Sequence, residues 1–224
     1  MQWHVVPESL GYLIAGLRAT VVLGATALVT GTILGIVWGL LRVLPSRAVQ
    51  RVMTAVIEGV RAVPLLLQMF FIFFGLPALG IKMPVFLSAA LAMTLWMGAN
   101  LGEVIRGAVE SIARGQFEAG YSTGLGYVQV MRSIILPQAL RRMLPPYVGL
   151  CTILLKDTSL AAIIGVFELT RAAQETIERT FRSFELYVTV AAMYFVLCFA
   201  LTSVSRLLER RVSGPVRGGP GFAA

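Results

Sequence analysis

Five long apolar stretches, separated by polar segments, dominate the pattern of residues along this chain. A transmembrane α-helix needs about 20 mostly apolar residues to cross a bilayer. The stretches that approach this length span residues 20–41, 62–80, 85–102, 143–167 and 186–204. The first helix is predicted to begin near Ser9, and the polar run 156–159 interrupts the fourth stretch. The pattern predicts an all-α, polytopic membrane helix bundle of about five transmembrane helices over residues 1–212, followed by a disordered Gly- and Pro-rich tail over residues 213–224.

The composition supports the bilayer as the solvent of this chain. Hydrophobic residues make up 57% of the 224 residues, charged residues make up 13%, and the mean hydropathy is +0.81. A soluble domain of this size would need a larger charged surface. A net charge of +8 would favour nucleic-acid binding in a soluble protein, but here the arginines lie between apolar stretches. We therefore expect membrane lipid around the chain and no nucleic-acid partner.

The arginines also predict the orientation of the bundle. Segments rich in arginine follow the first, third and fifth stretches, and the positive-inside rule places such segments in the cytoplasm. These arginines are Arg42, Arg47, Arg51, Arg106, Arg114, Arg132, Arg141, Arg142, Arg206, Arg210, Arg211 and Arg217. The opposite side carries Glu8, Lys82 and the segment 168–185, in which acids balance arginines. Five spans then place the N-terminus outside and the C-terminus in the cytoplasm.

The longest polar segment, residues 106–142, lies between the third and fourth stretches and is predicted to be cytoplasmic. From residue 116 to residue 125, apolar and small residues recur at helical spacing, and glycines at 115, 124 and 126 mark the ends. This pattern predicts a short helix bounded by glycine. From periodicity alone, the helix could either lie on the membrane surface or protrude from the bundle as a compact element.

A motif in this segment resembles the signature loop of ABC importer permeases. In that family Glu-Ala-Ala is followed by Gly, Ile and Leu-Pro, with three, nine and one residues between them. The matching residues are Glu118-Ala119-Gly120, Gly124, Ile134 and Leu136-Pro137. All spacings agree, and Gly120 in place of the second alanine is expected to loosen the helix. The resemblance implies that these residues form the coupling helix, which docks on an ATPase subunit, and its support.

Three further segments resemble the permeases of polar amino acids, the histidine/glutamine/arginine/opine group. They are Arg61-Ala-Val-Pro-Leu-Leu-Leu-Gln68, Glu103-Val-Ile-Arg106-Gly107 and Lys156-Asp157-Thr158-Ser159-Leu160. The resemblance covers roughly residues 10–212. Asn100 stands where a tyrosine would be expected in that group, which leaves the substrate open.

The resemblance implies a subunit of a type I importer in the inner membrane of a bacterium. In such importers two permease subunits, identical or related, form the pore. An ABC ATPase dimer drives transport, and an extracytoplasmic solute-binding protein delivers the polar amino acid. The chain has no Gly-x-x-x-x-Gly-Lys-[Ser/Thr] phosphate-binding loop. We therefore expect no enzyme activity and no cofactor in this chain, with ATP and Mg²⁺ bound by the partner ATPase.

Polar residues inside the apolar stretches are the candidates for the solute path. The candidates are Lys156, Asp157, Thr158, Ser159, Gln68 and Asn100. An unpaired charge at membrane depth is costly, so Lys156 and Asp157 either line the pore or are solvated at a helix break near the outer interface. Gln68 and Asn100 could face the pore or hydrogen-bond to a neighbouring helix. Glu58 and Arg61, three residues apart, are expected to form a structural ion pair.

Two other functional classes are alternatives to the importer permease. A secondary transporter or channel for small polar solutes would need several intramembrane carboxylates or internal repeats. A membrane enzyme would need a nucleophile with a base, or a cluster of metal ligands. The sequence offers neither pattern, and Cys151 and Cys198 lie inside apolar stretches without a partner motif. The pore-forming permease subunit of an ABC importer for polar amino acids is therefore the primary hypothesis.

Overall fold

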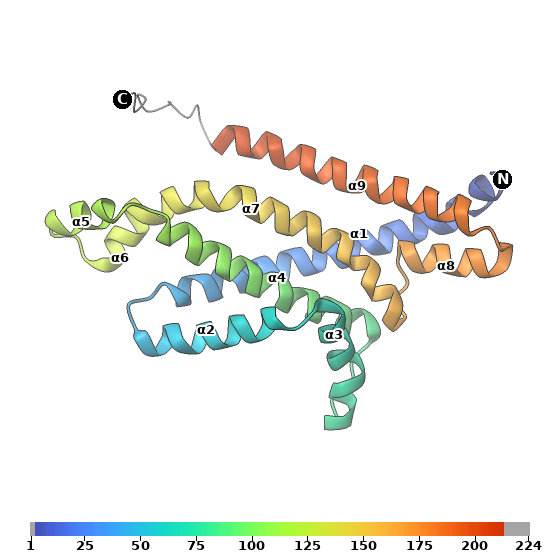
Figure 1. Ribbon diagram of the computed structural model, residues 1–224, viewed down its shortest axis with the longest axis horizontal. Coiled ribbons are helices and arrows are strands. Elements are labelled where there is room, and N and C mark those ends of the chain that lie inside the picture. Colours follow the sequence, from blue (N-terminus) through green and yellow to red (C-terminus); the bar gives the residue numbers. More distant parts are fainter. Residues whose placement is uncertain (1–2, 213–224) are drawn as a thin grey trace, which may run out of the picture.

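The structure is a computed structural model that describes the backbone of residues 3–212 and the side chains of residues 3–203. All regular elements in this part of the chain are helical (Figure 1). In chain order they are α1 Val5–Arg42, α2 Arg47–Ala62, α3 Leu65–Phe70, η1 Phe71–Gly75, η2 Leu76–Leu79, α4 Val85–Glu110, α5 Arg114–Ser122, α6 Tyr127–Val130, η3 Met131–Ile135, α7 Leu136–Asp157, η4 Thr158–Ile164, α8 Leu169–Thr180 and α9 Ser183–Val212. The predicted tail, residues 213–224, lies outside the described residues.

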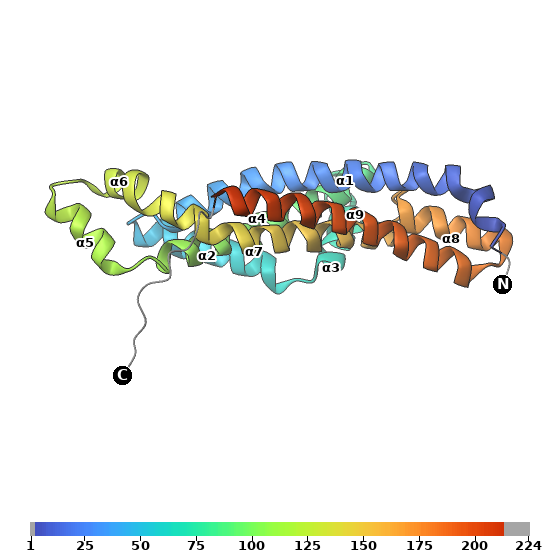
Figure 2. The same cartoon turned by 90° about the horizontal axis from the view of Figure 1, so that it is seen from above.

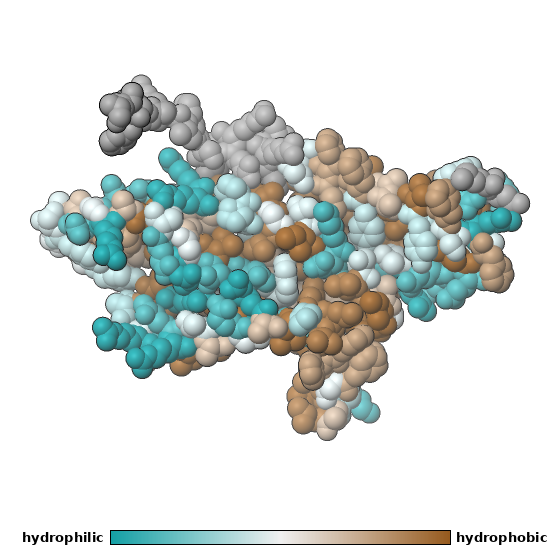
Figure 3. All heavy atoms as spheres, viewed as in Figure 1, coloured by the Kyte–Doolittle hydropathy of each residue, from teal (hydrophilic) through white to brown (hydrophobic). Residues whose placement is uncertain are grey.

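The helices form an elongated bundle with different elements at its two ends (Figures 1 and 2). The start of α1 and α8 lie at one end, and α5 and α6 lie at the other, which we call the loop end. Hydrophilic residues gather toward both ends and hydrophobic residues over the middle (Figure 3). Among the described residues, four helical stretches are long and apolar enough to cross a membrane, and one bent pair of helices raises the number to five. The predicted all-α membrane bundle is confirmed.

The second span differs from its prediction as one stretch over residues 62–80. It begins at Arg47, and the chain bends by 97° between α2 and the segment Leu65–Leu79. Pro64 lies at the bend and has no backbone N–H to continue the helix. Gln68 stabilises the bend, because its amide nitrogen donates to the carbonyl oxygens of Val60 and Val63 at 2.9 and 2.8 Å. The segment after the bend protrudes sideways from the bundle (Figure 1).

The fourth span is longer than predicted, and the polar run 156–159 changes the type of helix without breaking the span. Helical backbone continues from Tyr127 to Ile164. The α-helix α7 ends at Asp157, and the next seven residues form the 3-10 helix η4. The helix stops at Gly165, whose φ of 94° lies in the left-handed region that glycine tolerates best.

Glycines on one face of α1 bring it close to α4. They face larger side chains that recur at the same four-residue spacing on α4. The facing pairs are Gly31 with Met97, Gly35 with Leu101, and Gly39 with Ile105. A β-carbon added at any of these glycines would lie 2.6 or 2.7 Å from the β-carbon of its partner. Such small residues let membrane helices approach each other closely, and here they hold α1 and α4 together as one unit.

The helix α8, at the end opposite the loop end, was not predicted from the sequence (Figure 1). Glu168 is fully buried and caps this helix, because its carboxylate accepts hydrogen bonds from the backbone N–H groups of Thr170 and Arg171 at 2.9 and 2.7 Å. Tyr194 of α9 donates to the same carboxylate at 2.8 Å. The hydroxyl of Thr20 in α1 accepts the N–H of Leu169 at 3.0 Å. These bonds attach α8 to both α1 and α9.

Candidate functional site

The predicted coupling motif lies at the loop end and is divided among three elements. Glu118, Ala119 and Gly120 belong to α5, Ile134 belongs to η3, and Leu136-Pro137 opens α7. Gly120 is buried, and a β-carbon there would lie 2.8 Å from Cγ2 of Val130 and 3.0 Å from Cδ1 of Ile134. Gly120 therefore has a packing role that the sequence did not indicate. The missing methyl group lets α5 pack closely on the following helix.

Gly124 ends α5 in a Schellman motif. Its N–H donates to the carbonyl oxygen of Tyr121 at 3.0 Å, and the N–H of Leu125 donates to that of Gly120 at 3.3 Å. Its φ of 80° is left-handed, and a β-carbon at this position would meet nothing within 4 Å. Glycine is thus favoured at position 124 by the left-handed backbone conformation, and the space around it is open to a docking partner.

Glu118 and Ala119 form part of the exposed face of α5. Glu118 is the fifth residue of α5, so it lies one turn away from the N-terminal N–H groups that favour an acid. It makes no hydrogen bond or ion pair with another residue whose side chain is described. Its carboxylate is therefore available to a group outside this chain.

A widened helical turn connects the loop to α7. In η3 the N–H of Leu136 bonds to the carbonyl oxygen of Met131, five residues earlier, as in a π-helix. Pro137 follows and has no N–H to donate. The Gln138 side chain donates to the Ile134 carbonyl oxygen at 2.8 Å and to the Gln116 side chain of α5 at 3.1 Å. Gln138 thereby joins α5 to the start of α7. This contact was not predicted from the sequence.

Two further contacts join the loop to the ends of the membrane helices. The hydroxyl of Tyr127 donates to the carbonyl oxygen of Val43, one residue beyond α1. The guanidinium of Arg142 donates to the backbone carbonyl of Ser111, and to its hydroxyl at 3.0 Å, one residue beyond α4. The loop is therefore bonded to the same two helices that the glycine contacts hold together.

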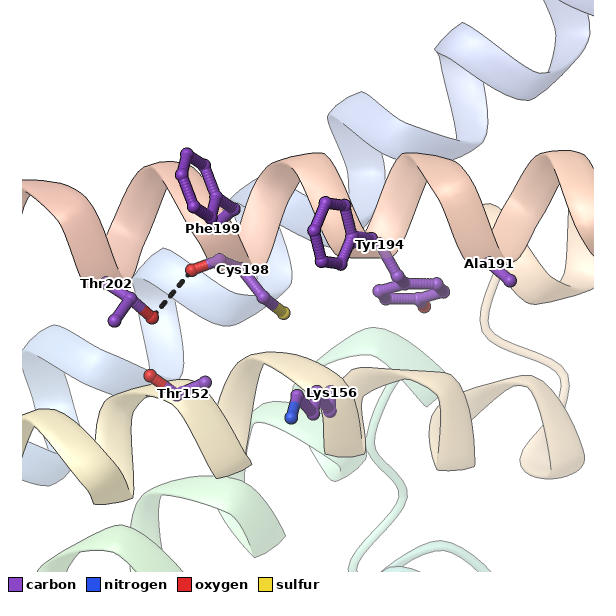
Figure 4. A pocket seen from close by; sticks show the side chains of 8 residues that line it. Thr152, Lys156, Ala191, Tyr194, Cys198, Phe199 and Thr202 are labelled. Atoms are coloured by element: carbon purple, nitrogen blue, oxygen red, sulfur yellow. Dashed lines mark hydrogen bonds between the residues drawn. The ribbon is translucent and has the colours of Figure 1, made fainter.

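Lys156 lines a hollow between α7 and α9 (Figure 4). The hollow measures about 430 Å³. Its lining residues are Thr152, Lys156, Ala191, Tyr194, Phe195, Cys198, Phe199 and Thr202. Lys156 and Thr152 are one turn apart on the face of α7 that looks toward α9, and the sulfur of Cys198 points back toward α7. The hollow thus offers one cation and several hydroxyl groups between apolar walls.

The other residues of the polar run lie at the junction of α7 and η4. Asp157 is half-buried, and neither it nor Lys156 makes a hydrogen bond or ion pair with another residue whose side chain is described. The hydroxyl of Thr158 is buried and donates to the Leu155 carbonyl oxygen at 2.8 Å. The hydroxyl of Ser159 donates to that of Lys156 at 2.8 Å. The two charges are therefore available to a ligand, while the two hydroxyls already have an acceptor.

Gln68 and Asn100 lie outside this hollow. Gln68 is buried beside the bend at Pro64 and lines a different hollow, formed by α2, α3, η1 and α4. Its carbonyl oxygen has no hydrogen-bond partner among the described residues. Asn100 is half-buried and donates to the carbonyl oxygen of Trp96, one turn earlier in α4. The structure therefore does not bring these two residues together with Lys156 and Asp157.

Six charged residues near the loop end form ion pairs with one another. The predicted pair of Glu58 with Arg61 is confirmed, at 3.1 Å. Glu103 pairs with Arg42 and Arg106, and Arg106 also pairs with Glu110. The sequence showed the intrahelical spacings, but it gave no signal for the partners of Arg42 because these lie on other helices.

The contribution of α9 to the hollow beside Lys156 was not predicted from the sequence. Tyr194, Cys198 and Thr202 recur at four-residue spacing, which places them on one face of the helix. This weak polar stripe in an otherwise apolar helix is the signal that could have revealed them. The buried thiol of Cys198 is free.

Comparison with known proteins identifies the family. Residues 31–214 match the family model described as "Binding-protein-dependent transport system inner membrane component". The chain is 37% identical over 212 residues to the glutamine transport system permease protein GlnP of Escherichia coli strain K12, covering 94% of this chain and 97% of that protein. It is 35% identical over 212 residues to the L-cystine transport system permease protein TcyB of Bacillus subtilis strain 168, covering 94% and 91%.

A solved structure shares the fold over nearly the whole chain. The crystal structure of an amino acid ABC transporter with histidines has a TM-score of 0.89 and 30% sequence identity, covering 94% of this chain and 99% of that one. The matched region contains all the predicted coupling residues and the hollow beside Lys156. This chain belongs to the family of binding-protein-dependent transport system inner membrane components.

Proposed function

We propose that this chain is the pore-forming permease subunit of an ATP-driven importer for polar amino acids. The observation that carries the proposal is the match over nearly the whole chain to permeases named for glutamine and cystine transport. The exposed coupling motif at one end of a membrane bundle fits this function. The role is transport, and the energy comes from ATP hydrolysed by a partner.

The partners are an ABC ATPase dimer, a second permease copy or a related permease, and an extracytoplasmic solute-binding protein. The exposed Glu118 and the open space around Gly124 suit docking of α5 on the ATPase. ATP and Mg²⁺ bind to the ATPase. Among the described residues, no group of three or more His, Cys, Asp or Glu side chains could hold a metal ion.

The solute path includes Lys156 and Asp157. A zwitterionic amino acid needs both a cation and an anion, or oriented helix ends, to replace its hydration inside the membrane. Lys156 and Asp157 provide both signs at the end of α7, and neither is neutralised by another described side chain. Thr158 and Ser159 support the helix junction, and Gln68 and Asn100 are secondary candidates along the path. Weak binding suffices, because the solute-binding protein supplies the affinity.

The loop end faces the cytoplasm and the end with α8 faces outward, in the inner membrane of a bacterium. The arginine-rich segments 42–51 and 106–142 support this orientation under the positive-inside rule. Single cysteines in place of the exposed residues Glu118 and Glu178 test it, in a chain lacking Cys151 and Cys198. A membrane-impermeant reagent should label position 178 from outside and position 118 after the membrane is opened. Labelling of both from one side would overturn the orientation.

Reconstitution tests the function directly. The permease is co-expressed with its ATPase, purified, placed in liposomes and supplied with the binding protein and radiolabelled glutamine or cystine. We expect the ATPase to co-purify, and uptake to require ATP and the binding protein. A secondary transporter or channel would instead move solute without ATPase, and that result would overturn the proposal. A Walker-lysine variant of the ATPase is the matched control for the requirement for hydrolysis.

A further inference from the structure

Six charged side chains near the loop end join α1, α2 and α4 through five ion pairs. Three of the pairs lie within a single helix. They are Arg61–Glu58 in α2, and Arg106–Glu103 and Arg106–Glu110 in α4. The other two pairs join different helices, and both are made by Arg42, to Glu58 and to Glu103. The pairs of Arg42 thus connect one helix to another, whereas the pair of Arg171 with Glu175 lies within α8.

Arg42 lies where it can contact two helices at once. It is the last residue of α1, and its side chain is only 9% exposed. Its guanidinium pairs directly with Glu103 and lies 3.5 Å from Glu58, and its Nε has no hydrogen-bond partner among the described residues. The planar guanidinium can bind two carboxylates together, which the single ammonium of lysine does not reproduce.

The helices that Arg42 connects differ in how firmly they are packed. The facing glycines hold α1 against α4 along three turns. In contrast, α2 has one fully buried residue, Ile57, which packs beside Gly102 of α4. It is linked to α1 by residues 43–46 and to α3 by the bend at Pro64. The place of α2 against the α1–α4 pair therefore depends on few contacts, and Arg42–Glu58 is one of them.

We propose that Arg42 is a positioning residue whose contact with Glu58 couples movement of the loop to the second span. The proposal rests on the proposed importer function. Tyr127 of the loop donates to the carbonyl of Val43, the residue next to Arg42. A displacement of the loop by the ATPase thus acts beside Arg42, and Arg42 passes it to α2. The bend at Pro64 connects α2 to the apolar segment 65–79. A displacement of α2 therefore also moves this segment of the second span.

The charges around this contact allow it to form and break during a transport cycle. Glu58 is half exposed and also pairs with Arg61, and Glu103 also pairs with Arg106. Either acid can therefore leave Arg42 without remaining unpaired. Glu58 is the exposed partner, and Arg42 keeps Glu103 when the Glu58 carboxylate is removed, so the removal is expected to cost the fold little. A loss of function on removing it would consequently report on coupling rather than on folding.

The experiment compares Glu58→Gln with Glu110→Gln in the complete complex in liposomes. Both changes remove one carboxylate of similar exposure, 50% and 60%, but Glu110 pairs only within α4. The readouts are the melting temperature, co-purification of the ATPase, ATP hydrolysis and solute taken up per ATP hydrolysed. We expect uptake per ATP to fall about fivefold or more in Glu58→Gln and to stay unchanged in Glu110→Gln. Folding, assembly and hydrolysis should be preserved in both.

A double variant tests whether Arg42 acts through Glu58. Arg42→Gln should also lower uptake per ATP, and Arg42→Gln with Glu58→Gln should be no worse than Arg42→Gln alone. Unchanged uptake per ATP in Glu58→Gln, or an equal loss in Glu110→Gln, would overturn the inference even if Arg42→Gln fails to fold. Failure of the unchanged complex to import solute would instead contradict the proposed function, so the two failures are distinguishable.

Discussion

Gly35 of α1 and Leu101 of α4 lie so close that a β-carbon on Gly35 would be 2.7 Å from the β-carbon of Leu101. The same arrangement recurs one turn away in both directions, at Gly31 and Gly39. Since the neighbouring atom is a β-carbon fixed to the backbone, a rotamer change of Leu101 cannot relieve the contact. The glycines therefore set the distance between the first and third spans.

Gly35→Ala should destabilise the bundle by about 1–3 kcal/mol, because the added methyl group forces α1 and α4 apart. Gly11→Ala is the matched control in the same helix, since a β-carbon there meets nothing within 4 Å. It should be neutral or slightly stabilising, because alanine favours the helix over glycine. The melting temperatures of the detergent-purified variants measure the effect. Equal melting temperatures would show that the helices are not in tight contact.

Gly124→Trp should prevent association with the ATPase, because the indole would fill the open space beside α5. The left-handed φ of 80° adds backbone strain of about 1–2 kcal/mol for any side chain. Gly124→Ala carries this strain without the bulk and is therefore the control. Co-purification of the ATPase should be lost in the tryptophan variant and largely kept in the alanine variant. If a normal amount of ATPase co-purifies with Gly124→Trp, position 124 does not take part in docking.

Lys156→Gln and Asp157→Asn should each reduce solute uptake while ATP hydrolysis by the assembled complex continues. Both charges lack a partner among the described side chains, so their removal costs the fold little and deprives a zwitterionic solute of one contact. Thr152→Val, in the same hollow and one turn from Lys156, removes a hydroxyl without changing charge. Uptake in liposomes at a saturating concentration of binding protein is the measurement. Unchanged uptake in both charge variants would show that Lys156 and Asp157 do not contact the solute and are only solvated at the helix junction.

Stability should depend on pH through Glu168. Burial raises the pKa of this carboxyl above its ordinary value of 4.5, although hydrogen bonds from Thr170 and Arg171 oppose the shift. The folded protein thus holds the proton more tightly than the unfolded chain. The corresponding stability is complete below pH 4.5 and is lost as the pH rises through the raised pKa. Relative to Glu168→Gln, the melting temperature of the unchanged protein should therefore fall over this range. Parallel pH profiles would contradict the assignment.

The membrane spans were predictable because the thickness of the bilayer fixes the length of an apolar stretch. Their ends were not, because helices such as α1 and α7 continue into polar segments that the membrane does not constrain. The break at Pro64 was not predicted, although a proline in this position could have indicated it. The role of Gln68 at the bend appears only when its two acceptor carbonyls are placed. The helix α8 was missed because its small buried residues, Ala172 and Ala173, give a weak apolar signal.

The short helix of the loop and the glycine that ends it were predictable from the sequence, whereas their packing was not. The positions of Glu118 and Gly124 followed from the resemblance, and Gly124 indeed ends the helix. The reason for Gly120 required knowledge that Val130 and Ile134 approach it from the next helix. In the same way, Lys156 and Asp157 stood out as charges in an apolar stretch, but Tyr194 and Cys198 on α9 became visible only when the two helices were placed together.

The length of α1 has a mechanical consequence. With 38 residues it extends about 57 Å, farther than the membrane is thick. In the first half of the helix Thr20 bonds to the start of α8, and just beyond its C-terminal end the carbonyl of Val43 bonds to Tyr127 in the loop that carries α5. One continuous rod thus touches the elements on both sides of the bilayer. A tilt of that rod would move both surfaces at the same time, so the two ends of the bundle are geometrically linked through a single helix.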